Sequence, residues 1–164
     1  MGFGTADTDV AALQLTDHTA LLTDTAGGEL FRPLISSYFK NVRAVIIVFD
    51  VTSRESMLKC KNWVQMIVDK KVTDCVLAAV GNKTDITDKR EVSTEEGRAY
   101  FDAMSPSLPY FETSAKTGEG VDELLDTVVG MVLEKAYALC GNDNATIEDK
   151  VPEGGGGWGK CIIC

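Results

Sequence analysis

Apolar positions along the chain fall into two kinds of stretch, short runs that are apolar throughout and longer stretches with helical spacing. Residues 43–50 and 75–80 are nearly all apolar and rich in β-branched side chains, which is typical of strands buried on both faces of a parallel sheet. Residues 10–15 and 18–23 predict two adjacent strands in a hairpin, and residues 108–113 predict a short final strand.

Helices are predicted in the segments between these strands and after the last of them. The strongest pattern is an apolar stripe over residues 121–136, and residues 29–40 predict a further helix. Ser53 can cap a helix that follows it, and Ser93 and Glu96 have the spacing of a capping box. Strands that alternate with helices predict an α/β fold, a mostly parallel open sheet with helices on both faces. Ligands bind such sheets at the carboxyl ends of the strands.

Length and composition limit the classes of function. The 164 residues suffice for one domain, at residues 1–140, followed by a glycine-rich flexible tail at residues 141–164. Sixteen basic and 25 acidic side chains give a net charge of −9, which argues against a nucleic-acid partner. No apolar run is long enough to span a bilayer, and five cysteines without regular spacing suit free thiols in a reducing cytosol.

The motif N-K-x-D follows the second buried strand, as Asn82-Lys83-Thr84-Asp85, and resembles the guanine-binding loop of the GTPase superfamily. The carboxylate of Asp85 can accept two hydrogen bonds from guanine, one from the ring N–H and one from the exocyclic amine. Adenine cannot supply that pair of donors. Lys83 can lay its aliphatic stem over the base, and Asn82 can join neighbouring loops.

A second motif, E-T-S-A-K at residues 112–116, resembles the other base-contacting loop of the same superfamily. The resemblance implies that the backbone N–H of Ala115 meets the guanine oxygen and that Ser114 braces Asp85. Lys116 completes the motif. The two motifs lie one strand-helix unit apart, which makes the pair far more specific than either one alone.

A third motif, D-x-x-G, runs from Asp24 to Gly27. In the superfamily its carboxylate reaches Mg²⁺ through a water, and its glycine amide meets the γ-phosphate. Residues 48–53, V-F-D-V-T-S, and Trp63 resemble features found throughout Rab-type GTPases. Over residues 21–139 the chain is therefore identified as a Rab-like member of the Ras superfamily.

Two departures from the family pattern bear on mechanism. No G-x-x-x-x-G-K-[ST] occurs in these residues, so the P-loop that holds the β- and γ-phosphates is absent, together with the first strand and first helix of the family's domain. Gly28 stands where the family has the glutamine that orients the attacking water, so we assign no catalytic residue.

The missing strand also raises a structural question. In the family it lies between the strand that ends at Asp24 and the strand that ends at Asp50. Three outcomes are open: the two flanking strands pair with each other, another segment fills the slot, or the chain folds poorly.

The resemblance implies a Rab-like GTP-binding switch in vesicle trafficking, with nucleotide binding and hydrolysis impaired in this chain. The alternative is a pseudo-GTPase, an interaction module without nucleotide control. The implied ligands are GTP or GDP with Mg²⁺, and the implied partners are effector and exchange-factor proteins. We expect a monomer at the cytosolic face of an endomembrane.

The chain ends in Cys161-Ile162-Ile163-Cys164, which has the C-a-a-X form of a prenylation site. Cysteine at the last position leaves open whether Cys161 alone or both thiols carry a lipid. One lipid chain gives only marginal membrane binding, so stable anchoring needs both cysteines or a partner. The rival interpretation is a C-x-x-C metal or redox pair, but it lacks the second ligand pair that zinc needs.

Overall fold

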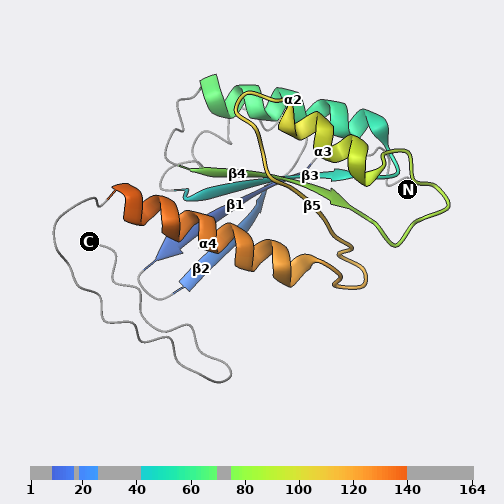
Figure 1. The fold of residues 1–164 in the computed structure, drawn as a ribbon. Helices are drawn as coiled ribbons and strands as arrows, with labels where there is room; N and C mark the ends of the chain where they lie inside the picture. Colours follow the sequence, from blue (N-terminus) through green and yellow to red (C-terminus); the bar gives the residue numbers. More distant parts are fainter. Residues whose placement is uncertain (1–8, 17–18, 26–41, 70–74, 140–164) are drawn as a thin grey trace.

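The described strands of the computed structural model form one five-stranded sheet in the order β2-β1-β3-β4-β5 (Figure 1). The structure describes residues 9–16, 19–25, 42–69 and 75–139. The elements are β1 (Asp9–Thr16), β2 (Thr19–Thr25), β3 (Ala44–Asp50), α2 (Arg54–Asp69), β4 (Val76–Asn82), α3 (Thr94–Asp102), β5 (Tyr110–Glu112) and α4 (Val121–Leu139). The predicted helix at residues 29–40 and the predicted tail at residues 141–164 lie outside the described residues.

The α/β class is confirmed, with a parallel core and an antiparallel hairpin on one side of it. β3 pairs with β4, and β4 with β5, in parallel. β1 and β2 pair antiparallel, so the predicted hairpin is confirmed, with each strand slightly longer than the apolar pattern indicated. α2 and α3 cover one face of the sheet and α4 covers the other (Figure 1).

The hairpin answers the question of the missing strand. β1 lies between β2 and β3 and pairs with β3 antiparallel, with Asp9 opposite Val48 and Leu13 opposite Ala44. Another segment of the chain therefore fills the slot, and the two flanking strands do not meet. The physical reason is that a bare β3 edge would leave backbone N–H and C=O groups without partners, at a cost of about 1–3 kcal/mol for each that is kept from water.

Two apolar clusters, one on each face of the sheet, hold the layers together. One joins β3 to α2 and α3 and includes the fully buried Phe49 and Phe101 together with Trp63. The other joins β3 and β4 to α4 through Leu124, Val128 and Val132 on the helix. The apolar stripe predicted for the last helix thus faces the sheet as expected.

The predicted cap of α3 is present. Ser93 Oγ accepts a hydrogen bond from the backbone N–H of Glu96 at 3.2 Å, so it satisfies one of the free donors of the first turn. The start of α3 is therefore fixed in place.

Tyr110 fixes the position of β5 against α3. Its ring fits only because two glycines face it, since a Cβ at Gly81 or at Gly97 would lie 2.5 or 2.6 Å from its atoms. Its hydroxyl donates to Glu112 at 2.7 Å, and Arg90 forms an ion pair with the same carboxylate. Burial, followed by the bond to Glu112, raises the pKa of Tyr110, so the phenol stays protonated as a donor. This network holds the strand that leads into the second predicted loop.

Candidate guanine-binding site

The first loop of the site begins where β4 ends, at Asn82. Lys83 adopts φ +69°, a left-handed conformation that is uncommon for a residue with a side chain. The turn closes when Ile86 N–H donates to the Lys83 carbonyl at 3.0 Å. Thr84 and Asp85 are the two central residues of this turn.

Asn82 joins this loop to the one that follows β5. Its Oδ1 accepts the backbone N–H of Ala115 at 3.0 Å and the hydroxyl of Thr113 at 3.4 Å. Thr84 N–H donates to the Thr113 carbonyl at 3.2 Å, and Thr113 N–H donates to the Gly81 carbonyl at 2.9 Å. The two loops are therefore held side by side by contacts from both backbone and side chain.

Asp85 lies at the junction of the two loops, with its side chain only 13% exposed. Ser114 Oγ donates to its Oδ1 at 2.6 Å, and the ammonium of Lys116 lies 3.5 Å from its Oδ2. The Ser114 hydrogen bond, more than any other contact, holds the pKa of Asp85 below its ordinary value. The group is thus an ionised acceptor at neutral pH, with one oxygen held by serine and the other facing a lysine.

The second loop owes its shape to its own backbone contacts. Ser114 N–H donates to the Glu119 carbonyl at 2.9 Å, and Gly118 N–H donates back to the Ser114 carbonyl at 2.8 Å. Gly118 and Gly120 have φ values of +84° and +72°, which glycine adopts without strain. A Cβ at Gly120 would also lie 2.3 Å from the backbone oxygen of Glu112, so glycine is required where the loop passes the end of β5.

Asp50 is a functional candidate that the sequence prediction missed. Lys83 Nζ donates to its Oδ2 at 2.6 Å, while the N–H and hydroxyl of Thr52 donate to its Oδ1 at 2.8 and 2.6 Å. Burial alone would raise the pKa of Asp50, but the hydrogen bonds from Lys83 and Thr52 outweigh it and leave the pKa below its ordinary value. The sequence shows that this apolar strand ends on a carboxylate, but the register that places Asp50 level with Asn82 comes from the structure.

Replacing Asp50 with asparagine should remove a pH-dependent part of the stability. Because the pKa of Asp50 is lowered by folding, its contribution is complete above the unfolded-state pKa and disappears as the pH falls through the folded-state pKa. We expect Asp50→Asn to lower the free energy of unfolding by about 1 kcal/mol at neutral pH, the value for an ion pair with a half-exposed partner. Urea titrations from pH 7 down to pH 3 measure this difference.

Glu55→Gln provides the control for that experiment, because Glu55 pairs with Lys59 on the exposed side of α2. Its effect should be smaller at every pH. A loss from Asp50→Asn that persists unchanged at acid pH would contradict the assignment of the Lys83 contact.

The structure brings most of the predicted site residues together at one edge of the sheet. The residues gathered there are Asn82, Lys83, Asp85, Ser114, Ala115 and Lys116. Gly27, Cys161 and Cys164 lie outside the described residues.

Asp24 is not brought to this edge. It lies in β2 opposite Ala11, which is opposite Ile46 in β3, whereas Asp50 is level with Asn82. The backbone of Asp24 therefore lies four residues, or about 13 Å along the strands, before the position of Asp50 and Asn82. It also lies three strands, or about 14 Å across the sheet, from β4. Among the residues described, no three His, Cys, Asp or Glu side chains gather as a metal site. None of the described helices is both long and apolar enough to cross a membrane.

Comparison with known proteins places this arrangement in a family. Residues 4–134, most of the chain, match the model of the Ras family. The chain is 35% identical over 115 residues to the Ras-related protein Rab-27B of Homo sapiens, covering 70% of this chain and 52% of the relative. It is 37% identical over 131 residues to the Ras-related protein Rab5 of Nicotiana tabacum, covering 80% of this chain and 64% of the relative.

The chain thus spans about half the length of Rab-27B. Two loops joined through Asn82 and Asp85 at the carboxyl edge of a parallel sheet agree with that match. The protein belongs to the Ras family and is similar to the Rab-type members of that family.

Proposed function

We propose that the chain recognises guanine nucleotides through the two joined loops and serves as a Rab-like switch whose nucleotide binding is weakened in this polypeptide. The observation that carries the proposal is the 2.6 Å hydrogen bond from Ser114 to Asp85, which joins the loops after β4 and β5 and orients the carboxylate. A carboxylate oriented in advance costs no reorganisation when the base binds.

The hydrogen-bonding groups of the loops fit guanine better than adenine. Guanine offers Asp85 two N–H donors, and it offers the backbone N–H of Ala115 an oxygen acceptor. Adenine presents an amine at that position, where it would meet another donor. Ala115 N–H already donates to Asn82 Oδ1 at 3.0 Å, so the guanine oxygen would share or replace this bond.

Binding of the phosphate half of the ligand is where this polypeptide would be weakened. This polypeptide lacks the P-loop motif, and β1 pairs with β3 on the side where the family has the strand that leads to that loop. Asp24 and Gly27 are the residues that we would assign to Mg²⁺ and the γ-phosphate, and in the sheet register Asp24 is distant from the base-binding loops. Charge-assisted phosphate contacts are the strong ones, so a site limited to base contacts should bind nucleotides weakly.

Titration with a fluorescent GDP analogue, with and without Mg²⁺, tests this proposal. We expect a Kd in the high micromolar to millimolar range, roughly −4 to −6 kcal/mol of binding free energy. The affinity should depend little on Mg²⁺ and should exceed that for the matching ADP analogue. Nanomolar, Mg²⁺-dependent binding would contradict the weakened-site proposal, and equal binding of GDP and ADP would contradict guanine recognition itself.

A pseudo-GTPase without nucleotide control is the second candidate. Gly28 in place of the water-orienting glutamine and the antiparallel β1–β3 pairing both favour it. Under this alternative the domain would unfold cooperatively but show no guanine preference in the same titration. A chain that folds and binds neither nucleotide would therefore support it over the switch.

Membrane tethering belongs to the same proposal. Cys161 and Cys164 would carry prenyl groups, and the lipidated tail would hold the domain at the cytosolic face of an endomembrane. Effector and exchange-factor proteins would be its partners in vesicle trafficking. Mass spectrometry of the protein from its native cells should find a prenyl group on at least one of these cysteines, and two unmodified thiols would count against the tether.

A further inference from the structure

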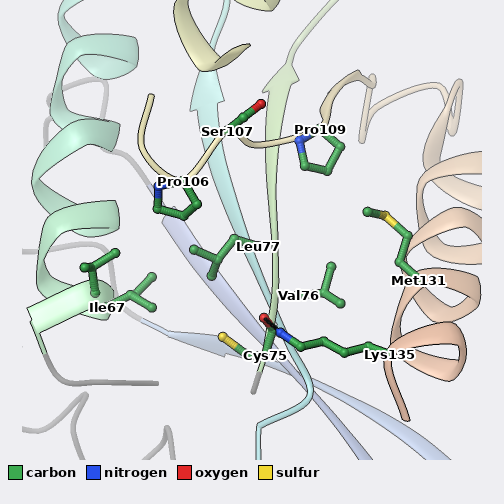
Figure 2. A pocket seen from close by; sticks show the side chains of 10 residues that line it. Ile67, Cys75, Val76, Leu77, Pro106, Ser107, Pro109, Met131 and Lys135 are labelled. Carbon is green, nitrogen blue, oxygen red and sulfur yellow. Dashed lines mark hydrogen bonds between the residues drawn. The ribbon is translucent and has the colours of Figure 1, made fainter. Parts of the chain in front are cut away.

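A groove lies at the end of the sheet opposite the guanine-binding loops, below the start of β5. It has a volume of about 410 Å³ and is lined on one side by Ile67 of α2 and by Pro106, and on the other by Met131 and Lys135 of α4 (Figure 2). Val68 of α2 also lines it. The groove exists because β5 is short. Its pairing with β4 begins at Ala79, so the first residues of β4 extend past it.

The floor of the groove is the edge of β4 beside Leu77, where none of the described strands pairs with it. Val76 N–H donates toward β3, to the Arg43 carbonyl at 2.8 Å, and Ala79 N–H donates to the other side, to the Pro109 carbonyl at 2.9 Å. Because successive residues of a strand point their backbone groups to alternate sides, the N–H and C=O of Leu77 point the same way as those of Ala79. Among the described strands, none pairs with Leu77 on that side.

A lysine marks the outer end of this edge. Lys135 Nζ donates at 3.0 Å to the carbonyl of Cys75, the next backbone group that points outward from β4. The strand edge between this contact and Pro109 is long enough to pair with one short extended segment. A strand edge with apolar side chains on both flanks suits a segment that adds a strand and places side chains on alternate faces.

We propose that the groove binds the chain's own C-terminal segment, residues 161–164, in extended form beside Leu77. Ile162 and Ile163 are adjacent, so in an extended segment they point to opposite faces of the sheet. One would meet the flank formed by α2 and Pro106, and the other the flank formed by Met131. A polar segment could not use both flanks in this way.

The place where α4 ends favours this occupant over a separate partner. α4 ends at Leu139, four residues or about 6 Å along the helix from Lys135 at the rim. The 22 residues from there to Cys161 include four consecutive glycines, and a flexible chain of that length has a root-mean-square span of about 25 Å. Such a tether holds the segment at an effective concentration on the order of 1 mM, whereas a free partner must reach that concentration by itself.

Docking would withdraw both terminal cysteines from solvent, so the same segment would be either bound in the groove or available for lipid attachment. This inference does not depend on nucleotide binding. It concerns the unmodified chain and a surface at the other end of the sheet.

The alkylation rates of Cys161 and Cys164 in the unmodified full chain test the proposal. The experiment compares wild type with Val68→Asp, in the groove, and with Leu58→Asp, a matched control because Leu58 is also on α2, is 52% exposed and does not line the groove. With an effective concentration of about 1 mM and a Kd of about 0.1 mM, wild type and Leu58→Asp should react about tenfold more slowly than Val68→Asp. Mass spectrometry assigns the rate at each cysteine.

A second variant, Ile162→Ser with Ile163→Ser, leaves the groove intact and should also react at the fast rate. In wild type the Leu77 amide should exchange with deuterium more slowly than in this double variant. Damage to the groove cannot explain that difference, because the groove residues are the same in both proteins. Equal rates in all four proteins would overturn the proposal. Slow alkylation that weakens on dilution would also overturn it, because the occupant would then be a second copy of the chain.

Discussion

Replacing Gly120 with alanine should destabilise the domain more than any other single methyl group added to the site. The new Cβ would lie 2.3 Å from the backbone oxygen of Glu112, which cannot move away without disturbing β5. The residue also has φ +72°, a conformation that costs alanine about 1–2 kcal/mol. Together with overpacking of about 1–3 kcal/mol, the expected loss in the free energy of unfolding is about 2–5 kcal/mol. Chemical denaturation monitored by circular dichroism measures it.

Gly118→Ala is the matched control, because Gly118 has a similar φ of +84° but nothing within 4 Å of its added Cβ. Its cost should be limited to the conformational part, about 1–2 kcal/mol. Equal losses for the two variants would mean that the contact between the loop and the end of β5 is not as close as the structure places it.

Replacing Asp85 with asparagine should have the largest effect on base selectivity. Asparagine keeps one oxygen acceptor but presents an NH₂ donor where guanine offers its own amine, so two donors would face each other. We expect the affinity for the GDP analogue to fall about a hundredfold, since the charged acceptor of one hydrogen bond is lost and a second bond becomes repulsive. The affinity for the xanthine analogue should rise, because its 2-oxo group can accept from the new amide.

Asp88→Asn serves as the control, since Asp88 is an exposed carboxylate a few residues further along the same connection. It removes the same charge and should leave both affinities within about twofold of wild type. If the two variants weakened GDP binding equally, net charge and not base recognition would account for the result.

The sequence predicted the part of the site that depends on local order along the chain. Motifs that follow adjacent parallel strands must meet at the same edge of the sheet, so the approach of Asp85 to Ser114 followed from the motifs and the strand order of the family. The Ser93 cap of α3 was likewise readable, because capping depends on residues three positions apart.

Other features depend on contacts that the sequence pattern does not encode. The apolar patterns of residues 10–15 and 18–23 predict a hairpin but do not show which strand lies on its other side, and the antiparallel pairing of β1 with β3 became clear only from the structure. This pairing also sets the position of Asp24 along the strands, which the spacing of the motifs does not predict.

The contact between Lys83 and Asp50 could not be predicted from the sequence pattern either. It joins residues 33 positions apart, and it depends on the carboxyl ends of β3 and β4 lying level. A strand that ends in aspartate is common, so the carboxylate alone did not identify its partner.

The central claim is that the loops at residues 82–85 and 113–116 together form a guanine-binding surface. Amide NMR spectra of the ¹⁵N-labelled chain during titration with guanosine, inosine and adenosine monophosphates test it most directly, since this method detects millimolar binding. Guanosine monophosphate should shift the amides of Asn82, Asp85 and Ala115 together along one saturable curve. Inosine monophosphate, which lacks the exocyclic amine, should shift them more weakly, and adenosine monophosphate should leave them in place. Shifts of equal size with all three nucleotides, or shifts confined to other parts of the chain, would contradict the claim.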